Sequence, residues 1–492
     1  MVFSSNIFLL YFLPLFLLVY FLSPKKIRNY TLLLASLLFY AWGAPEFIIQ
    51  LVLSVIANFF LVRWMCQTKN DKTKKLLCAI SIIIPIGLLV FYKYAHFLVE
   101  NLDALLGYWG SSKLSTLNSQ LSTILLPIGI SFFSFQSVTY TLDTYRGINP
   151  PMKKLSDFML YITMFPQLIA GPIVRYRDVA DQIRSRESSY ADRLQGFYRF
   201  VIGLCKKILI ADVLGAQVDA MLGPANLSNL AADQLATITE RIAGLDTTTA
   251  WVIALAYTFQ IYFDFAGYSD MAIGLGRIMG FKFPENFDNP YTSRSITEFW
   301  RRWHMTLGAF IKNYLYIPLG GNRKGTGRTY LNLWICFLLS GLWHGASWNF
   351  VLWGALHGLF ICIDKVLSGK RKTETFPLST LFTFILVVLL WVFFRIERIG
   401  LAWTFVTRMF AFDFGAMALA SNAQFYTTLV VAALFSFITL TGFGRKLQEK
   451  VYYTDYNGWQ HLVVWVLAIA AFLFCLGALN ATGFSPFIYF RF

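Results

Sequence analysis

Long stretches without charge recur along the whole of this 492-residue sequence. A helix needs about 20 mostly apolar residues to cross the hydrocarbon core of a membrane. Hydrophobic residues make up 57% of the chain and charged residues 14%, whereas soluble domains have about 45–50% and about 25%. The chain is therefore predicted to be an all-α integral membrane protein. The charge-free stretches are residues 1–24, 29–45, 47–62, 76–92, 114–142, 158–174, 247–263, 329–363, 376–394, 414–444 and 456–490.

The number of crossings follows from the lengths of these stretches. Residues 329–363 are enough for two short crossings, or for one crossing and a helix that turns back. With more polar segments near 195–211 and 297–320, we expect a polytopic helical bundle of about 11 to 13 crossings. No hydrophilic stretch is long enough for a separate soluble domain, so one domain over residues 1–492 is expected. Its parts are N-terminal helices in 1–150, a motif-bearing core at about 155–370 and C-terminal helices in 375–492.

The positive charge lies in short segments between the apolar stretches. Lys and Arg number 42 and Asp and Glu 26, a formal net charge of +16. Clusters such as Lys25, Lys26 and Arg28 are typical of cytosolic loops, so the charge does not favour a nucleic-acid partner. Residues 1–22 carry no charge, so the basic segment that opens a signal peptide is missing, and Lys25 and Lys26 follow the apolar run instead of preceding it. This pattern indicates a retained helix with an outside N-terminus instead of a cleaved signal peptide.

The first loops alternate in charge, since they are basic at 25–28, poor in charge at 41–46 and basic at 63–75, and residues 150–190 break this alternation. Basic residues stand on both sides of this apolar run, and Pro166, Gly171 and Pro172 would interrupt a helix within it. Irregular backbone at membrane depth is tolerated only where protein buries it or a wet cavity adjoins it. A re-entrant hairpin is expected, and a plain crossing with an irregular charge bias stays open as the alternative.

His344 is the first candidate for chemistry. It lies inside the stretch 329–363, with Gly341 and Gly345 close by. An ionisable group at membrane depth needs a partner or a hydrated cavity, and is often functional. A neutral imidazole can take a proton from a hydroxyl nucleophile. The alternative is a histidine that only hydrogen-bonds a neighbouring helix.

His304 ends a segment rich in Trp and Arg that begins near Thr297. Thr297 is a candidate helix cap, and Glu298 and Arg302 are spaced for an ion pair. The segment could be an interfacial anchor. Equally, Arg301 or Arg302 could bind a phosphate or carboxylate, which a guanidinium recognises well.

Polar residues also share one face of the helix expected around residue 264. Asp264, Tyr268 and Gln260 are spaced by four residues, and an interhelical hydrogen-bond contact is the favoured interpretation. His357 is interpreted as a similar packing group. His96 and His461 flank apolar runs beside aromatic residues and suit interfacial anchoring. No metal-ligand spacing, P-loop or nucleotide-binding glycine motif occurs, so no metal site is expected.

Four longer strings carry a family resemblance. They are FDFAGYSDMAIG (263–274), PENFDNPYTSRSITEFWRRWHMTLG (284–308), YLYIPLGG (314–321) and LSGLWHGASW (339–348). With these strings the chain resembles the membrane-bound O-acyltransferase superfamily, and within it the bacterial branch of alginate and peptidoglycan O-acetylation proteins. The opening VFSSNIFLLYFLPL and the ending SPFIYFRF are also similar to that branch.

The resemblance implies a ring of helices in which funnels from both membrane faces meet at a central histidine. It places the catalytic histidines at His344 and His304. It implies an O-acetyltransferase of the bacterial inner membrane that uses cytosolic acetyl-CoA as donor substrate, with no bound cofactor. The implied acceptor is a periplasmic or membrane-tethered SGNH-type acetyltransferase, or the polysaccharide itself. Residues in or beside the motifs are assigned to substrate binding, namely Arg301, Arg302, Trp303, Trp343, Asp264, Tyr268 and Asn289.

Three alternatives stay open at this stage. A D-alanyl or other acyl transferase of the same fold would take its group from a carrier-protein thioester. A transporter of polysaccharide or acyl groups would share polarity over many pore residues and would tolerate loss of one imidazole. A scaffold for a secretion complex would tolerate changes at both His304 and His344.

Overall fold

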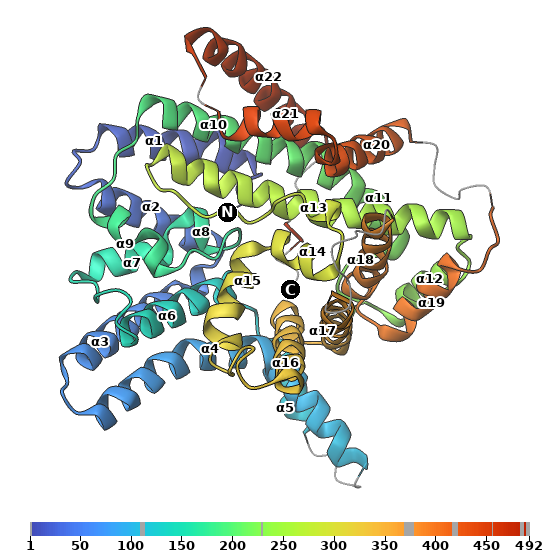
Figure 1. Ribbon diagram of the computed structural model, residues 1–492, viewed down its shortest axis with the longest axis horizontal. Coiled ribbons are helices and arrows are strands. Elements are labelled where there is room, and N and C mark those ends of the chain that lie inside the picture. The colour runs from blue at the N-terminus through green and yellow to red at the C-terminus, as the bar shows by residue number, and fades with distance from the viewer. Residues whose placement is uncertain are drawn as a thin grey trace. The chain divides into compact units, whose positions relative to one another are not determined.

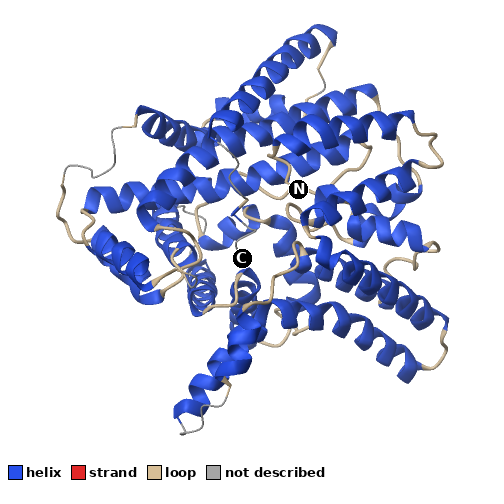
Figure 2. Ribbon diagram, turned by 180° about the vertical axis from the view of Figure 1, so that it is seen from behind, coloured by secondary structure: helices blue, strands red, loops and turns tan. Residues whose placement is uncertain are grey.

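The computed structural model describes residues 2–108, 114–227, 230–368, 378–415, 422–454, 456–482 and 487–488. Every regular element in these ranges is a helix, which confirms the all-α prediction (Figures 1 and 2). The chain forms two compact units, Met1–Gly196 with Ala272–Pro284 and Phe197–Met271 with Glu285–Phe492. The expected division into three parts of one domain stays a prediction.

The first unit holds the N-terminal helices, and α10 and α13 contribute residues to both units. The elements up to α10 are η1 (Ile7–Phe12), α1 (Leu13–Leu22), α2 (Arg28–Gly43), η2 (Pro45–Phe47), α3 (Ile48–Gln67), α4 (Asp71–Tyr108), α5 (Ser115–Ser122), α6 (Ile130–Tyr145), α7 (Leu155–Thr163), α8 (Phe165–Leu168), α9 (Tyr176–Arg184) and α10 (Tyr190–Cys205). The labels η1, η3 and η5 denote π-helical turns, and η2, η4 and η6 denote 3₁₀ turns.

The second unit holds the remaining helices. They are η3 (Lys206–Ala211), α11 (Asp212–Leu222), α12 (Ala232–Ala243), α13 (Thr247–Ile278), η4 (Pro290–Thr292), α14 (Ile296–Arg302), α15 (Met305–Ile311), η5 (Lys312–Tyr316), α16 (Thr326–His344), α17 (Trp348–Ser368), α18 (Ser379–Arg395), α19 (Ile399–Met409), α20 (Ala423–Phe437), η6 (Ile438–Leu440), α21 (Gly442–Tyr452) and α22 (Gly458–Thr482).

A proline inside α4 shows how the first unit keeps its buried backbone paired. Pro85 has no N–H to donate, so the carbonyl of Ser81, four residues earlier, loses its helical partner. The buried Asn58 of α3 donates its Nδ2 to that carbonyl at 2.9 Å. Ser134 of α6 in turn donates to the carbonyl of Pro85 at 3.0 Å. Side chains of α3 and α6 therefore satisfy the break and hold the three helices together.

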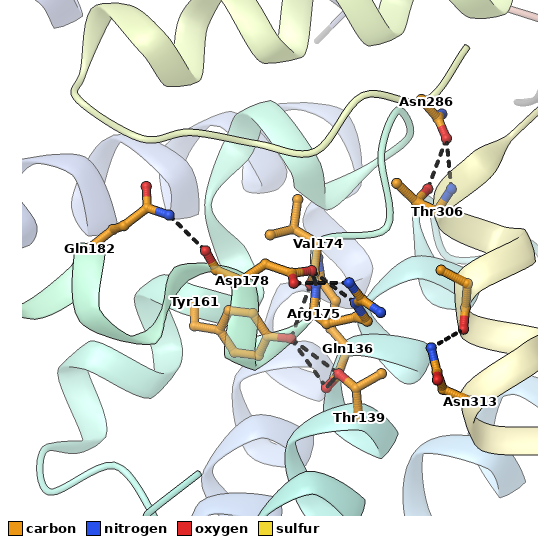
Figure 3. Close-up of polar contacts among 11 residues, drawn as sticks. Gln136, Thr139, Tyr161, Val174, Arg175, Asp178, Gln182, Asn286, Thr306 and Asn313 are labelled. Atoms are coloured by element: carbon orange, nitrogen blue, oxygen red, sulfur yellow. Dashed lines mark hydrogen bonds and ion pairs between the residues drawn. The ribbon is translucent and has the colours of Figure 1, made fainter. Parts of the chain in front are cut away.

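The expected interruption at 158–174 is confirmed. The nine-residue α7 and the four-residue α8 are far shorter than the roughly 20 residues of a crossing. Protein buries the freed backbone, and the Tyr161 hydroxyl donates to the carbonyl of Val174 at 3.1 Å (Figure 3). Ser36 of α2 accepts from the backbone N–H of Phe165 at 3.1 Å. The return of this segment to the membrane face from which it enters stays a prediction.

The stretch 329–363 forms a hairpin of α16 and α17, which both sequence interpretations allowed. Of these two helices, only α17 is long and apolar enough to cross a membrane by itself. Two glycines allow the close approach. A Cβ built on Gly341 lies 3.1 Å from the Cα of Gly354, and one built on Gly354 lies 3.0 Å from the Cα of Gly341. Because these distances leave no room for a methyl group, both residues must be glycine for the backbones to meet.

Fewer helices than expected are long and apolar enough to cross a membrane by themselves. In the described part of the chain five meet this criterion, or six if the bent pair α12 and α13 is one span. The expected 11 to 13 crossings are not reached by this criterion, because several apolar stretches are divided into short helices. The N-terminal run Ile7–Leu22 and α18 are apolar but shorter. The five helices lie in Pro45–Gln67, Asp71–Tyr108, Trp348–Leu367, Ala423–Leu440 and Gly458–Ala481.

Replacement of either hairpin glycine by alanine should destabilise the protein. The added methyl group would overpack the contact between α16 and α17, at a cost of about 1–3 kcal/mol. Gly341→Ala and Gly354→Ala should therefore each lower the melting temperature in detergent by several degrees. Gly327→Ala on α16 is the control, since a Cβ there meets nothing within 4 Å. Equal melting temperatures for the three variants would contradict this packing.

Candidate functional site

His344 is the last residue of α16, and the protein buries it to 2% exposure. Its Nδ1 lies 2.6 Å from the carbonyl oxygen of Ser340, one turn earlier. A carbonyl can only accept, so Nδ1 must carry the proton. In the neutral ring, Nε2 then holds the lone pair. This arrangement gives His344 the form that a general base requires.

His304 stands at a break between two short helices. It lies outside the candidate membrane-spanning helices, between α14 and α15, with a left-handed backbone at φ 45°. Its side chain is fully buried, and its Nδ1 lies 3.0 Å from Oδ1 of Asn286. Burial, followed by the nearby His344, holds the pKa of His304 well below its usual value. The imidazole is therefore neutral at physiological pH.

Asn286 also fixes which nitrogen of His304 carries the proton. Its Oδ1 accepts from the hydroxyl of Thr306 at 2.8 Å and from the Thr306 backbone N–H (Figure 3). Its Nδ2 donates to Ser269 at 3.1 Å. Because Oδ1 is an acceptor, Nδ1 of His304 must donate to it, and Nε2 holds the lone pair. That Nε2 is buried and has no hydrogen-bond partner among the described residues.

The indole of Trp343 brings the two predicted catalytic histidines together. Its ring centroid lies 4.8 Å from that of His344 and 5.9 Å from that of His304. Phe265 of α13 also contacts His304, edge to face at 4.7 Å. Two buried imidazoles, both with an Nε2 lone pair in the neutral form, therefore flank one aromatic side chain.

A second tryptophan links His344 to a third histidine. The Trp353 ring of α17 lies 4.9 Å from His344 and 4.7 Å from His357, one helical turn further along. Trp300 of α14 donates from Nε1 to Nδ1 of His357 at 3.1 Å. His357 is fully buried. It is therefore part of the same aromatic cluster as His344.

The segment before His304 is held by caps that the sequence indicated only in part. Ser295, not Thr297, caps α14, because its hydroxyl accepts from the backbone N–H of Glu298 at 3.1 Å. Thr297 instead donates from its backbone N–H to Asp364 of α17 at 2.8 Å. The predicted ion pair of Glu298 and Arg302 is confirmed at 2.8 Å.

The other motif residues predicted to bind substrate have varied surroundings. Arg301 is exposed. Trp303 is fully buried, stacks on Phe299 at 5.5 Å and packs against Trp391 of α18 at 4.9 Å. Asn289 has a left-handed backbone and donates to Gln448 of α21 at 2.9 Å. Substrate binding by Arg301, Arg302, Trp303, Trp343 and Asn289 stays a prediction.

The polar face of α13 forms an interhelical polar contact at Asp264, as the favoured interpretation required, while Tyr268 and Gln260 make packing contacts. Asp264 pairs with Lys207 of η3 at 2.7 Å and accepts from the backbone N–H of Ile488 at 2.7 Å. Tyr268 stacks on Phe487 at 4.7 Å, and Gln260 packs against Gly215 of α11. A substrate-binding role for Asp264 and Tyr268 stays a prediction beside these structural contacts.

The two remaining histidines lie in other helices. His96 is exposed on α4, and His461, at the start of α22, lies beside Tyr198, whose hydroxyl donates to its backbone carbonyl at 3.1 Å. Among the described residues no group of three His, Cys, Asp or Glu side chains could hold a metal ion.

Four residues that contact the site histidines were given no role from the sequence, namely Asn286, Phe265, Trp300 and Trp353. Asn286 lies in a motif string, but Asn289 is equally polar and only three residues away. A buried imidazole requires a partner, so the presence of one was predictable. Its identity depends on how residues 285–306 fold back, which the sequence pattern does not reveal.

Comparison with known proteins identifies the family. The sequence model of the membrane-bound O-acyltransferase family matches residues 106–403. A probable alginate O-acetylase AlgI of Pseudomonas putida is 38% identical over 508 aligned residues, which cover 100% of both chains. The chain belongs to the membrane-bound O-acyltransferase family. The resemblance drawn from the motifs is thus confirmed.

Further relatives of this membrane-bound O-acyltransferase carry related names. A probable alginate O-acetylase AlgI of Pseudomonas aeruginosa is 40% identical over 91% of the chain and 82% of the relative. A peptidoglycan O-acetyltransferase of Helicobacter pylori is 36% identical over 81% of the chain and 78% of the relative. The protein is accordingly a membrane-bound acyltransferase.

Loss of the Asn286 acceptor should destabilise the site. Asn286→Leu removes the acceptor of His304 Nδ1 and of the Thr306 hydroxyl, and each buried donor left unpaired costs about 1–3 kcal/mol. The melting temperature in detergent should fall by several degrees. Thr306→Val, which removes one donor and leaves His304 paired, should lower it by less. A smaller effect of Asn286→Leu than of Thr306→Val would contradict the assigned network.

Proposed function

We propose that this protein is an O-acetyltransferase that passes acetyl groups from cytosolic acetyl-CoA across the bacterial inner membrane. The acceptor is a periplasmic or membrane-tethered SGNH-type acetyltransferase, or the polymer directly. The product is an O-acetylated extracytoplasmic polysaccharide such as alginate or peptidoglycan. The names of the relatives support an acetyl group and a polymer of this class.

The observation that carries the proposal is the contact between His344 Nδ1 and the carbonyl of Ser340 at 2.6 Å. It leaves Nε2 of the neutral ring able to accept a proton. A thioester is already activated, so transfer needs a hydroxyl, a base for its proton and a donor for the oxyanion. His344 supplies the base in this scheme.

His304 has a supporting role in the proposed reaction. Its Nε2 also holds a lone pair, and Trp343 lies in contact with both imidazoles. His304 can therefore position the acceptor hydroxyl or handle a second proton. The neutral state favoured by its burial suits either task, since a protonated ring could not accept.

The rival donor within the family is a carrier-protein thioester that brings D-alanine or another acyl group. The same two histidines would serve that chemistry, so the geometry does not separate the donors. The 38% identity over the full length of a probable alginate O-acetylase supports acetyl transfer. A non-catalytic transporter has no need for an imidazole held in one tautomer.

The His344→Ala variant should lose transfer while it keeps its place in the membrane. Removal of a general base costs about 10²–10⁴-fold in rate. The measurement uses purified protein in lipid, radiolabelled acetyl-CoA and an SGNH-type acetyltransferase as acceptor. His96→Ala is the control, because His96 lies on an exposed face of α4.

The wild type and His96→Ala should label the acceptor equally, and His344→Ala should not. A well-inserted His344→Ala protein with unchanged transfer would overturn the assignment of the base. If the wild type consumes no acetyl-CoA, the donor assignment fails, and a carrier-linked acyl group becomes the donor to test.

A further inference from the structure

The hydrogen bond between Trp300 and His357 fixes the protonation of a third buried imidazole. An indole N–H can only donate, so Nδ1 of His357, at 3.1 Å, must be an unprotonated acceptor. The ring is therefore neutral and carries its one proton on Nε2. His357 thus has the opposite tautomer to His304 and His344, whose Nδ1 atoms face acceptors.

The Nε2–H of His357 has no hydrogen-bond partner among the described residues, although its atom is buried. Buried donors in native proteins are almost always paired, with protein or with another molecule. The environment on the protein side is aromatic, with Trp353 at 4.7 Å and Phe299 stacked parallel at 6.3 Å. The described residues therefore provide no acceptor for this donor, and a bound molecule could provide one.

A purely structural role does not explain this donor. The contact of Trp300 and His357 does join α14 to α17, but Thr297 and Asp364 already join the same helices at 2.8 Å. Such a contact uses only Nδ1, and an asparagine could provide the same acceptor. The neighbouring Trp353 ring contacts both His357, at 4.7 Å, and His344, at 4.9 Å.

We propose that His357 is a catalytic hydrogen-bond donor whose Nε2–H binds the carbonyl oxygen of the acyl group during transfer. This inference rests on the proposed acyl transfer and adds the oxyanion donor that His344 and His304 do not supply. A pair of opposite tautomers is what the reaction needs, since one imidazole must accept a proton while another stabilises negative charge.

The step balances without a further reagent. The acceptor hydroxyl oxygen attacks the thioester carbonyl carbon, its proton passes to Nε2 of His344, and the carbonyl π electrons move to oxygen. The oxyanion accepts a hydrogen bond from Nε2–H of His357, which keeps its proton. The oxyanion then collapses, the C–S bond breaks, and the thiolate takes the proton from His344.

Two amide substitutions separate this role from a structural one. His357→Asn keeps an acceptor near Nδ1 for Trp300 but has no donor at the Nε2 position. His357→Gln places an amide donor near the Nε2 position but withdraws the acceptor from Trp300. If His357 is a catalytic donor, His357→Asn should be inactive and His357→Gln active; if it is only a structural contact, the reverse should hold.

The test measures acetyl transfer from radiolabelled acetyl-CoA by purified protein in lipid, with melting temperatures beside the rates. His357→Asn should lower kcat about 10²–10³-fold, as loss of one oxyanion donor does, with KM for acetyl-CoA changed less than about threefold and the melting temperature kept. His357→Gln should recover transfer to within about tenfold of the wild type. His96→Asn is the matched control and should be fully active.

Transfer by His357→Asn within about threefold of the wild type would overturn the proposal. If His357→Asn does not fold, His357→Gln decides, because a folded His357→Gln protein whose acetyl transfer has fallen more than about a hundredfold also overturns the proposal. Failure of the underlying function has a separate signature. In that case the wild type and His96→Asn transfer no acetyl group either.

Discussion

The need to pair every buried polar atom inside the protein governs this structure more than any other constraint. Lipid offers no hydrogen bonds, so an imidazole inside such a protein is oriented by whatever donor or acceptor it meets. Ser340 and Asn286 present acceptors to His344 and His304, and Trp300 presents a donor to His357. The chemistry available at each ring follows from that partner.

The glycine contact of α16 and α17 is what lets these partners meet. Gly341 and Gly354 allow the two backbones to touch, so that His344 at the end of α16 packs on Trp353 of α17. A turn further along α17, His357 accepts a hydrogen bond from Trp300 of α14, and Asp364 accepts from the backbone N–H of Thr297 in the first turn of the same short helix. The hairpin thereby connects the two motifs that carry histidines.

Much of the fold was predictable from hydropathy and from the position of prolines. The helical class, the interruption near Pro166 and the hairpin in 329–363 each follow from local rules of length and backbone pairing. The number of crossings does not, because a charge-free run such as 158–174 can divide into short helices that the chain buries. The local hydropathy pattern shows that a segment is apolar, but it does not show where a helix ends inside the protein.

Of the site, the sequence predicted the central histidine, His344, but not the partners that orient the buried rings. An ionisable residue inside an apolar run identifies His344 as unusual, and the same reasoning treated His357 as a packing group. The difference between those roles lies in the tautomer, which depends on Trp300, 57 residues away along the chain. Spacing along one helix cannot reveal such a partner, and neither can composition.

The most direct test of this account is the protonation of the three buried histidine rings. Solid-state ¹⁵N NMR of ¹⁵N-histidine protein in lipid, assigned with single-histidine variants, reports which ring nitrogens carry protons. The account predicts neutral rings with the proton on Nδ1 in His344 and His304 and on Nε2 in His357. A protonated Nε2 in neutral His344, or a proton on Nδ1 of His357, would contradict it.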